Sequence, residues 1–580
     1  MTPVRFMFSL LLIVIATLAV TFTACGDEGS AQGEAVALHA GEFTVVKMDP
    51  HAPAALQLAV HACQGLKNRK LGGSVFILME HHDQQWLDLL DLKPKEIINA
   101  SDFLNACADE FPACVRYSYA DQHEILPSIL TVAAVLGAVP LDVGMPLAGH
   151  HVAFDATIEF KDRKTPYLAT KYVFEKFIAQ TTGLAMLNPG YDPHPRDFSN
   201  PGLTADMSPR LVDFVFSQKL FTTFLNNGCR DGHPEKKLLH KVVNSGHWPT
   251  PLGVYGYNNS WGVAGYLYEA QTRALDSRNM GAIPTMTYNL SFFATRRPPI
   301  EIAGELQQNP PEDVQYDPKK TYVAFVVGDG DNIHFMMTTR KDWFLKRLAH
   351  CENAGNSRAP LTWSISPHLA RIAPDVLEWY YAASRKTGID YFILPPSGHL
   401  YSYPTSMNEA DQDRFVLATE RDARVLGVKS VVHWDWYSTW RSAEKRFLPK
   451  YARAEGAIRG VFPVNVPYFF PTFTWWPPDR FYEALPGEDG SKVVVFRPDE
   501  WRGTDGKGHN VTDGPFCLTP KDMAGKLGNY PPGTVAGIYM TSDGGLNLEN
   551  SFMELIQLLP SHVQIVSADT AVRLALTANR

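Results

Sequence analysis

Short apolar runs separated by helical patterns organise the second half of the chain. Several of these runs show no polar alternation, which is the pattern of a strand covered on both faces, as in a parallel sheet. Helical patterns lie between them, and one helix is expected to run from Pro374 to a C-terminal cap at Gly388, another to a cap at Gly427. The expected strands cover residues 321–327, 361–365, 389–394, 428–432, 460–464, 493–496, 535–540 and 563–566.

This alternation predicts an α/β fold whose C-terminal part, residues 320–580, is a (β/α)8-like barrel, since such barrels need roughly 250 residues. The fifth and sixth helices are poorly marked, and residues 466–478 form a proline-rich, aromatic stretch where a regular barrel would have a helix. We therefore expect either a regular or an irregular barrel. A doubly wound sheet is the main alternative.

The first half of the chain also mixes strand and helix patterns. Residues 43–300 predict an N-terminal α/β region, with helices at 54–66 and 85–92, a strand at 75–79, and a long amphipathic helix at 211–225. A proline-rich linker over residues 301–319 separates this region from the barrel-like part.

The N-terminus has the pattern of an export signal. Arg5 precedes an uncharged apolar stretch over residues 7–22, and Thr23-Ala24-Cys25 leads into a polar segment. We expect a bacterial lipoprotein signal over residues 1–24, lipid on Cys25, and a tether over 25–42. The protein would then be exported and anchored to the cell envelope. An uncleaved anchor helix is the alternative, although the stretch is shorter than the roughly 20 residues a span needs.

Charge and cysteine content narrow the classes of partner. The net charge of -8 argues against a nucleic-acid-binding protein, which needs a basic face. An uncharged glycan fits this composition at least as well. The chain has no C-x-x-C spacing for a structural metal, and Cys107 with Cys114 is the easiest local disulfide pair in an oxidising compartment.

Polar side chains follow the expected strands where each strand ends. In parallel α/β folds these ends share one rim, which is where functional residues gather. The rim candidates are Asp329, Asp331, Asn332, His368, His399, Tyr401, Tyr403, His433, Asp435, Glu500 and Asp543.

Part of this rim resembles a known family. The residues Gly398-His-Leu-Tyr401-Ser-Tyr403-Pro404 are similar to the motif that names the GxGYxYP putative glycoside hydrolases, with Leu400 in place of the second glycine. GDGDN at residues 328–332 and QGLKNR at 64–69 are also similar to that family. The resemblance implies carbohydrate processing, and an N-terminal domain without a known activity.

Glycoside hydrolysis needs two carboxyl groups, one as acid and one as nucleophile or base. We expect Asp331 and Asp435 in these roles, with Asp329 beside Asp331 and Asp543 in reserve. The alternative for residues 329–332 is a turn whose side chains bond their own backbone. Asp435 is equally open to a structural role, and the Asp543-Gly-Gly sequence slightly favours a turn.

No cofactor is expected, although a divalent metal is not excluded. Asp329 and Asp331 with His368 or His433 would suit a metal-dependent carbohydrate deacetylase. Two histidine pairs, His81-His82 and His150-His151, lack the H-E-x-x-H spacing and read mainly as surface or core histidines.

Aromatic and polar side chains supply candidate sugar contacts, because sugar rings present C–H faces that stack on aromatic rings. Packing in the core is the commoner use of such rings, and Tyr401 and Tyr403 could equally pin their loop. A noncatalytic surface glycan-binding lipoprotein would use the same groups. The expected substrate-binding residues are Asn332, His368, His399, Tyr401, Tyr403, Trp434, Trp436, Trp475 and Trp476.

Overall fold

The computed structural model describes most of the chain after the tether. The described residues are 41–187, 209–225, 227, 232–256, 280–353, 358–435, 442–464, 477, 479–502, 517–540 and 548–578. Residues 36–580 form one compact unit. No helix in this described part is long and apolar enough to cross a membrane.

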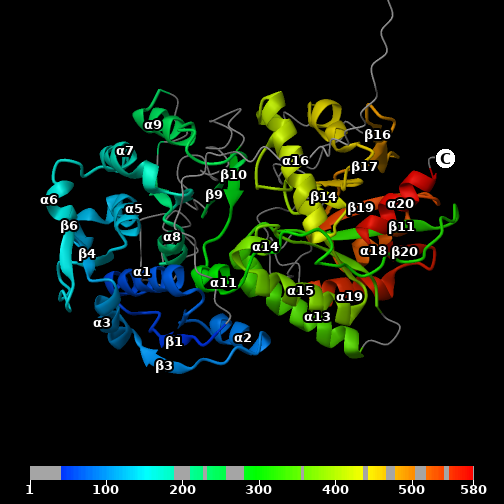
Figure 1. The fold of residues 1–580 in the computed structure, drawn as a ribbon. Coiled ribbons are helices and arrows are strands. Elements are labelled where there is room, and N and C mark those ends of the chain that lie inside the picture. Colours follow the sequence, from blue (N-terminus) through cyan, green and yellow to red (C-terminus); the bar gives the residue numbers. More distant parts are fainter. Residues whose placement is uncertain are drawn as a thin grey trace, which may run out of the picture. The chain divides into compact units, whose positions relative to one another are not determined.

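The first half of the chain contains three parallel sheets, with strand orders β2-β1-β3, β5-β4-β6 and β10-β9-β7-β8. Helix α1 packs against α8 and α11 (Figure 1). The main elements are β1 (Thr44–Lys47), α1 (Ala54–Leu71), β2 (Val75–Leu78), α2 (His81–Leu89), β3 (Glu96–Asn99), α3 (Ala100–Glu110), β4 (Ala113–Tyr117), α5 (Leu126–Leu136), β5 (Val139–Asp142), β6 (His151–Asp155), α7 (Pro166–Phe177), β7 (Leu184–Met186), α8 (Val212–Gln218), β8 (Phe221–Thr223), α9 (Pro234–Val243), β9 (Leu252–Tyr255), β10 (Met280–Ile283) and α11 (Leu290–Arg296).

The second half alternates strands with helices, and α13, α15 and α19 lie side by side (Figure 1). Its main elements are β11 (Thr321–Val327), α12 (Ile333–Phe335), α13 (Lys341–Asn353), β12 (Leu361–Ser364), α14 (Leu369–Ile372), α15 (Pro374–Thr387), β13 (Asp390–Ile393), α16 (Glu409–Leu426), β14 (Ser430–His433), β15 (Gly460–Pro463), β16 (Tyr482–Pro486), β17 (Lys492–Phe496), β18 (Glu500–Trp501), α18 (Pro520–Gly528), β19 (Val535–Met540), α19 (Leu548–Leu558), β20 (Val563–Val566) and α20 (Ala568–Ala578).

Two sheets share one core in this half. One has the order β13-β12-β11-β19-β18, with β20 also pairing with β11, and the other has the order β14-β15-β17-β16. A parallel bridge between Leu394 and Val431 joins them. Alternate residues of β11 (Tyr322, Ala324 and Val326) lie in the same buried cluster as Val432 of the second sheet.

The parallel α/β architecture predicted from the apolar runs is confirmed, and β19 and β20 have the expected bounds. Gly388 and Gly427 cap α15 and α16 in the left-handed conformation, as expected. A closed barrel is not confirmed, because no ladder among the described residues joins β17 to β18 or β19. The antiparallel strand β16, which pairs with β17, also departs from a regular barrel.

Two local predictions for the first half differ from the structure. The helix expected over residues 211–225 is wrong beyond Gln218, because Lys219 takes a left-handed conformation and β8 then pairs with β7. The helix expected over residues 85–92 is α2, which begins earlier because Glu80 and Asp83 form a capping box at its N-terminus.

Cys107 and Cys114, the easiest local pair for a disulfide, are not joined, since both thiols are free. Cys107 instead lies in hydrogen-bond contact with Cys63 of α1, and burial, with this contact, raises the pKa of Cys63 well above its usual value. Helix α3 packs on α1, which turns Cys107 toward that helix. Cys229 lies outside the described residues.

The loop after β13 pairs with the edge of a sheet from the first half of the chain. Tyr401 forms an antiparallel bridge with Ala282 of β10, with N···O distances of 2.9 and 3.1 Å. The neighbouring Gly281 makes room for this, since a Cβ there would lie 2.6 Å from Leu400 Cβ and 2.8 Å from Tyr401 O. A Cβ at Gly253 of β9 would lie 2.5 Å from Ile283 Cδ1 and 3.3 Å from Leu400 Cδ2.

This close approach predicts a stability loss for Gly281→Ala. The added methyl group forces the loop backbone away, so we expect the free energy of unfolding to fall by about 1–3 kcal/mol. Denaturant unfolding measures this. Gly525→Ala is the matched control, because no atom lies within 4 Å of its would-be Cβ and the site is helical. A variant as stable as the parent would contradict the docking geometry.

Candidate functional site

The GDGDN loop follows β11 and is shaped by backbone contacts with both neighbouring strands. Gly328 N donates to Met540 O at 2.8 Å, and Gly330 N donates to Ser364 Oγ at 2.9 Å. A Cβ at Gly328 would lie 2.1 Å from Tyr539 Oη, and one at Gly330 would lie 1.9 Å from Ser364 O. Only glycine fits at these two positions, so the loop holds its aspartates close to the strand ends.

The buried Tyr539 lies near several carboxylates of this rim. Tyr539 of β19 lies beside Glu500 of β18 in the parallel ladder, and Asp329 N donates to Tyr539 Oη at 3.4 Å. Burial, together with the negative charges of Asp329, Asp331 and Glu500, raises the pKa of Tyr539 well above its usual value. The phenol therefore stays protonated and can donate a hydrogen bond among acidic groups.

Arg340 supplies positive charge beneath this cluster. Its side chain is fully buried, and it donates to Ser364 O at 3.1 Å and also to Gly328 O. Burial lowers the pKa of Arg340, and nearby acidic groups, Asp329 and Asp331 among them, act against this lowering. A guanidinium here offsets part of the repulsion between the two aspartates.

Asn332 ends the loop with a structural contact. Its side-chain oxygen accepts from Phe335 N at 3.1 Å and caps helix α12. The turn interpretation of residues 329–332 is thus supported at Asn332. Its expected role in substrate binding stays a prediction.

Asp435 lies beyond β14 and is bonded to the motif loop. Its Oδ1 accepts from Thr405 Oγ1 at 2.5 Å, its Oδ2 accepts from Thr405 N at 3.2 Å, and His433 Nε2 lies 3.4 Å from Oδ2. The Asp435 side chain is buried. These contacts fix residues 404–406 and are compatible with either a structural or a catalytic carboxylate.

The motif tyrosines mainly hold their loop. Tyr403 is 1% exposed and lies in the core shared by the two sheets, and the Tyr401 and Trp434 rings are 5.5 Å apart. Ser397 Oγ donates to Ser402 O and Trp434 O at 2.8 and 2.6 Å. A pinning role is therefore favoured for Tyr403, whereas the expected sugar contacts of Tyr401 and Trp434 stay predictions.

His368 and His399 lie together, apart from the carboxylates around Tyr539. Their rings are 5.3 Å apart, and both line a cavity with residues of the first half of the chain. The charged groups that chiefly act on His368 are His399, Asp422 and Arg371, none of which belongs to the GDGDN loop. The expected rim set is therefore divided between two places.

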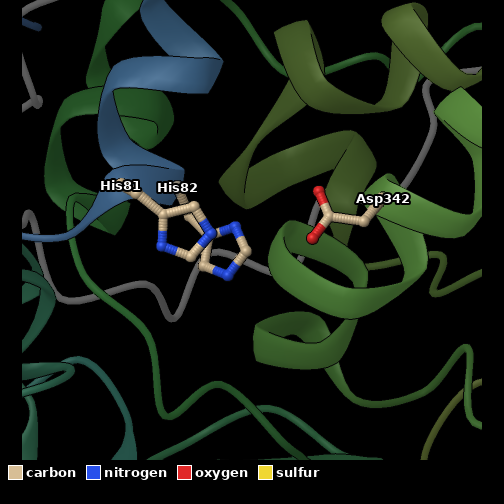
Figure 2. Close-up of side chains that lie close together, drawn as sticks. All are labelled: His81, His82 and Asp342. Atoms are coloured by element: carbon tan, nitrogen blue, oxygen red, sulfur yellow. The ribbon is translucent and has the colours of Figure 1, made fainter.

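One group in the described part of the chain has side chains close enough to share a metal ion: His81, His82 and Asp342 (Figure 2). Lys341 Nζ lies 3.0 Å from His82 Nδ1 and 3.3 Å from Asp342 Oδ1. An ammonium group at that position opposes a divalent cation. The metal site considered at Asp329 and Asp331 stays a prediction.

Several predicted residues lie outside the described residues, namely Cys25, Trp436, Trp475, Trp476 and Asp543. The sequence-based reasoning did not select Tyr539 or Arg340. Tyr539 lies within an apolar run and Arg340 lies in a helical stretch, so only the folded structure shows that both are near Asp331.

Comparison with protein families finds a match for part of the second half of the chain. Residues 319–468 match the model of the GxGYxYP putative glycoside hydrolase C-terminal domain. That stretch of the chain is similar to the family's C-terminal domain. Both the GDGDN loop and the motif loop described above fall within it. None of the curated proteins matches the chain.

Solved structures show where this fold occurs. A putative hydrolase from Bacteroides thetaiotaomicron is similar over 93% of this chain and 96% of its own, with a TM-score of 0.69 and 16% identity. The likeness establishes a shared fold that extends beyond residues 319–468. A putative polysaccharide deacetylase from Mycobacterium smegmatis covers 47% of this chain and 96% of its own, with a TM-score of 0.28 and 13% identity, too low to bear on the fold.

The buried His368 predicts a pH effect on stability. Burial, with the neighbouring His399, lowers the pKa of His368 to about 3, whereas the unfolded chain has the ordinary value of 6.5. Between these values the unfolded state binds the extra proton, so stability falls as pH is lowered through this window. When the pH is lowered from 6.5 to 5, the free energy of unfolding should fall in both proteins. We expect the fall to be smaller in His368→Gln than in the parent, by about 1–2 kcal/mol. Denaturant unfolding at the two pH values measures the difference, and equal losses would contradict a neutral His368.

Proposed function

We propose that the GxGYxYP domain hydrolyses O-glycosidic bonds of a poly- or oligosaccharide with carboxyl groups at the C-terminal ends of its parallel strands. The observation that carries this proposal is the gathering of Asp329, Asp331 and Glu500 around the protonated Tyr539. Glycosidases need one carboxyl group that donates a proton and one that is ionised. Acidic groups that share one site favour such a split, because the ionisation of one carboxylate disfavours that of the next.

Asp331 is the first carboxylate of the proposed site. Asp331 belongs to a loop that is held close to the sheet, because Gly328 and Gly330 are in contact with the two neighbouring strands. Arg340 favours an ionised group here, which suits a nucleophile or base. Tyr539 is positioned to donate a hydrogen bond to that carboxylate or to the substrate.

The second carboxylate is Asp435, as the sequence suggests, or Glu500. Asp435 follows β14 in the other sheet and so comes from a different part of the strand ends. Glu500 is fully buried and pairs with Arg502 at 3.2 Å. Asp543 remains the reserve candidate. Trp436, Trp475 and Trp476 are proposed sugar platforms, and Tyr401 and Trp434 are further proposed sugar contacts.

Sugar release from a panel of polysaccharides and glycosides tests this proposal. We expect the full chain to release sugar, and Asp331→Asn to lower release at least about a hundredfold, the usual worth of a positioned acid or base. Asp435→Asn and Glu500→Gln identify the partner, since the true partner causes a comparable loss. Glu483→Gln, at a surface carboxylate on β16 paired with Arg480, is the matched control and should leave release unchanged.

The outcomes separate the alternatives. Release that survives all three rim substitutions, in variants folded by circular dichroism, would contradict these carboxylates. Binding of a glycan without turnover would favour the noncatalytic glycan-binding protein. Release of acetate instead of sugar from an acetylated polysaccharide, lost on adding a chelator, would favour the metal-dependent deacetylase, because hydrolysis by paired carboxylates needs no metal ion.

We also propose export of the protein and lipid attachment at Cys25, as the N-terminal pattern suggests. A host fed labelled palmitate should incorporate label into the parent and recover it in the membrane fraction. Cys25→Ser removes the thiol that carries the lipid and should abolish both. Labelling that persists in Cys25→Ser would contradict a lipoprotein signal.

A further inference from the structure

A cavity of about 600 Å³ lies beside the motif loop, away from the carboxylates around Tyr539. Trp248 and Tyr255 line it from the first half of the chain, and His368, His399 and Asp422 line it from the second. This volume is typical of small-molecule sites, which span roughly 300–1,000 Å³. The docking of Leu400 on Gly253 closes one wall.

A histidine on this wall is oriented by a carboxylate. Asp422 Oδ2 lies 2.5 Å from His399 Nδ1, a contact that selects the tautomer with its proton on Nδ1 and its lone pair on Nε2. No other hydrogen bond in the described part of the structure reaches Nε2, and the side chain keeps 11% of its surface exposed. His399 therefore offers a fixed acceptor at the wall of the cavity.

His368 offers a second acceptor. Burial lowers its pKa to about 3, so the ring is neutral, and its Nε2 lies 2.7 Å from His399 O. A carbonyl oxygen can only accept, which puts the proton on Nε2 and leaves the lone pair on Nδ1. The two neighbouring imidazoles thus present acceptors for hydroxyl groups.

The charges around the cavity are balanced. Arg371 lies 3.7 Å from Glu301, and Arg421 lies 3.5 Å from Asp422, so each guanidinium faces a carboxylate. Neither a phosphorylated nor a cationic ligand gains a net electrostatic advantage in such a site. The rest of the wall includes aromatic and apolar side chains such as Trp248, Tyr255 and Leu400.

We propose that this cavity binds a small neutral saccharide, with its hydroxyl groups on His399 and His368 and its C–H faces against the apolar wall. Fixed acceptors, neutral charge and apolar surface together match a sugar ring better than a charged metabolite or a purely apolar ligand. This site is distinct from the carboxylates proposed for hydrolysis and does not depend on turnover there. It gives the first half of the chain a direct part in recognition.

Calorimetric titration of the full chain carrying Asp331→Asn tests this site without turnover. The probes are methyl β-glucoside, methyl α-mannoside, galactose, N-acetylglucosamine, cellobiose and maltose. At least one should bind saturably. Val425→Trp fills the cavity from a half-buried position on α16, and His399→Gln removes the Nε2 acceptor. Each should weaken binding about tenfold or more. Leu417→Trp, 56% exposed on the same helix and outside the cavity, is the matched control.

The titration can overturn the proposal in two ways. If no probe binds, a saccharide site in this cavity is refuted, whether or not the carboxylates at the strand ends hydrolyse a substrate. Binding that neither cavity variant weakens would place the sugar elsewhere, for example at the rim. If His399→Gln fails to fold by circular dichroism, Val425→Trp decides. Loss of hydrolysis in Asp331→Asn with cavity binding retained would leave both proposals standing.

Discussion

The antiparallel contact between Tyr401 and Ala282 is the interaction on which the rest of the structure depends. It depends on Gly281, which carries no side chain where the motif loop approaches the sheet. The same loop carries Tyr403 into the core of the second half and bonds Thr405 to Asp435. One short segment therefore sets the position of a rim carboxylate on one side and of the His399 cavity on the other.

The rim shows how a fold holds several acidic groups together. Asp329, Asp331 and Glu500 would repel one another if left without compensation, and burying charge is costly without partners. The chain compensates with Arg340 beneath the loop, Arg502 beside Glu500, and a phenol that burial keeps protonated. The backbone of the GDGDN loop cannot move away because its two glycines are in contact with neighbouring strands. A site of this kind is already arranged to stabilise charge that changes during a reaction.

The sequence predicts the parallel α/β architecture well, because buried strands read as uninterrupted apolar runs. Gly388 and Gly427 mark helix ends for the same local reason, as only glycine adopts the left-handed cap at low cost. The prediction of a single helix over residues 211–225 was wrong because the apolar spacing typical of a helix continues through β8. Only the pairing of β8 with β7 distinguishes this strand from helix α8. Spacing along the chain could not decide the cysteine pairing, because it says nothing about which face of α3 meets α1.

The candidate site was predictable in part. Strand ends point to Asp329, Asp331 and Asp435, since the direction of a parallel strand follows from the chain. His399 was assigned to the same rim, yet the loop turns after Pro395 and carries it to the cavity, guided by a sheet more than a hundred residues earlier in the sequence. Tyr539 and Arg340 were missed because their importance comes from the groups they face and not from their own sequence context.

The most direct test of the central claim is a crystal structure of the Asp331→Asn chain with an oligosaccharide that the parent cleaves. The account predicts a glycosidic oxygen held at the strand ends, within hydrogen-bond reach of residue 331 or Tyr539, with Asp435 or Glu500 facing it across the sugar. The separation of the paired carboxyl groups would also give the stereochemical course, since about 5–5.5 Å implies retention and about 6.5–9.5 Å implies inversion. A cleavable sugar bound with none of these groups near the scissile bond would contradict the account.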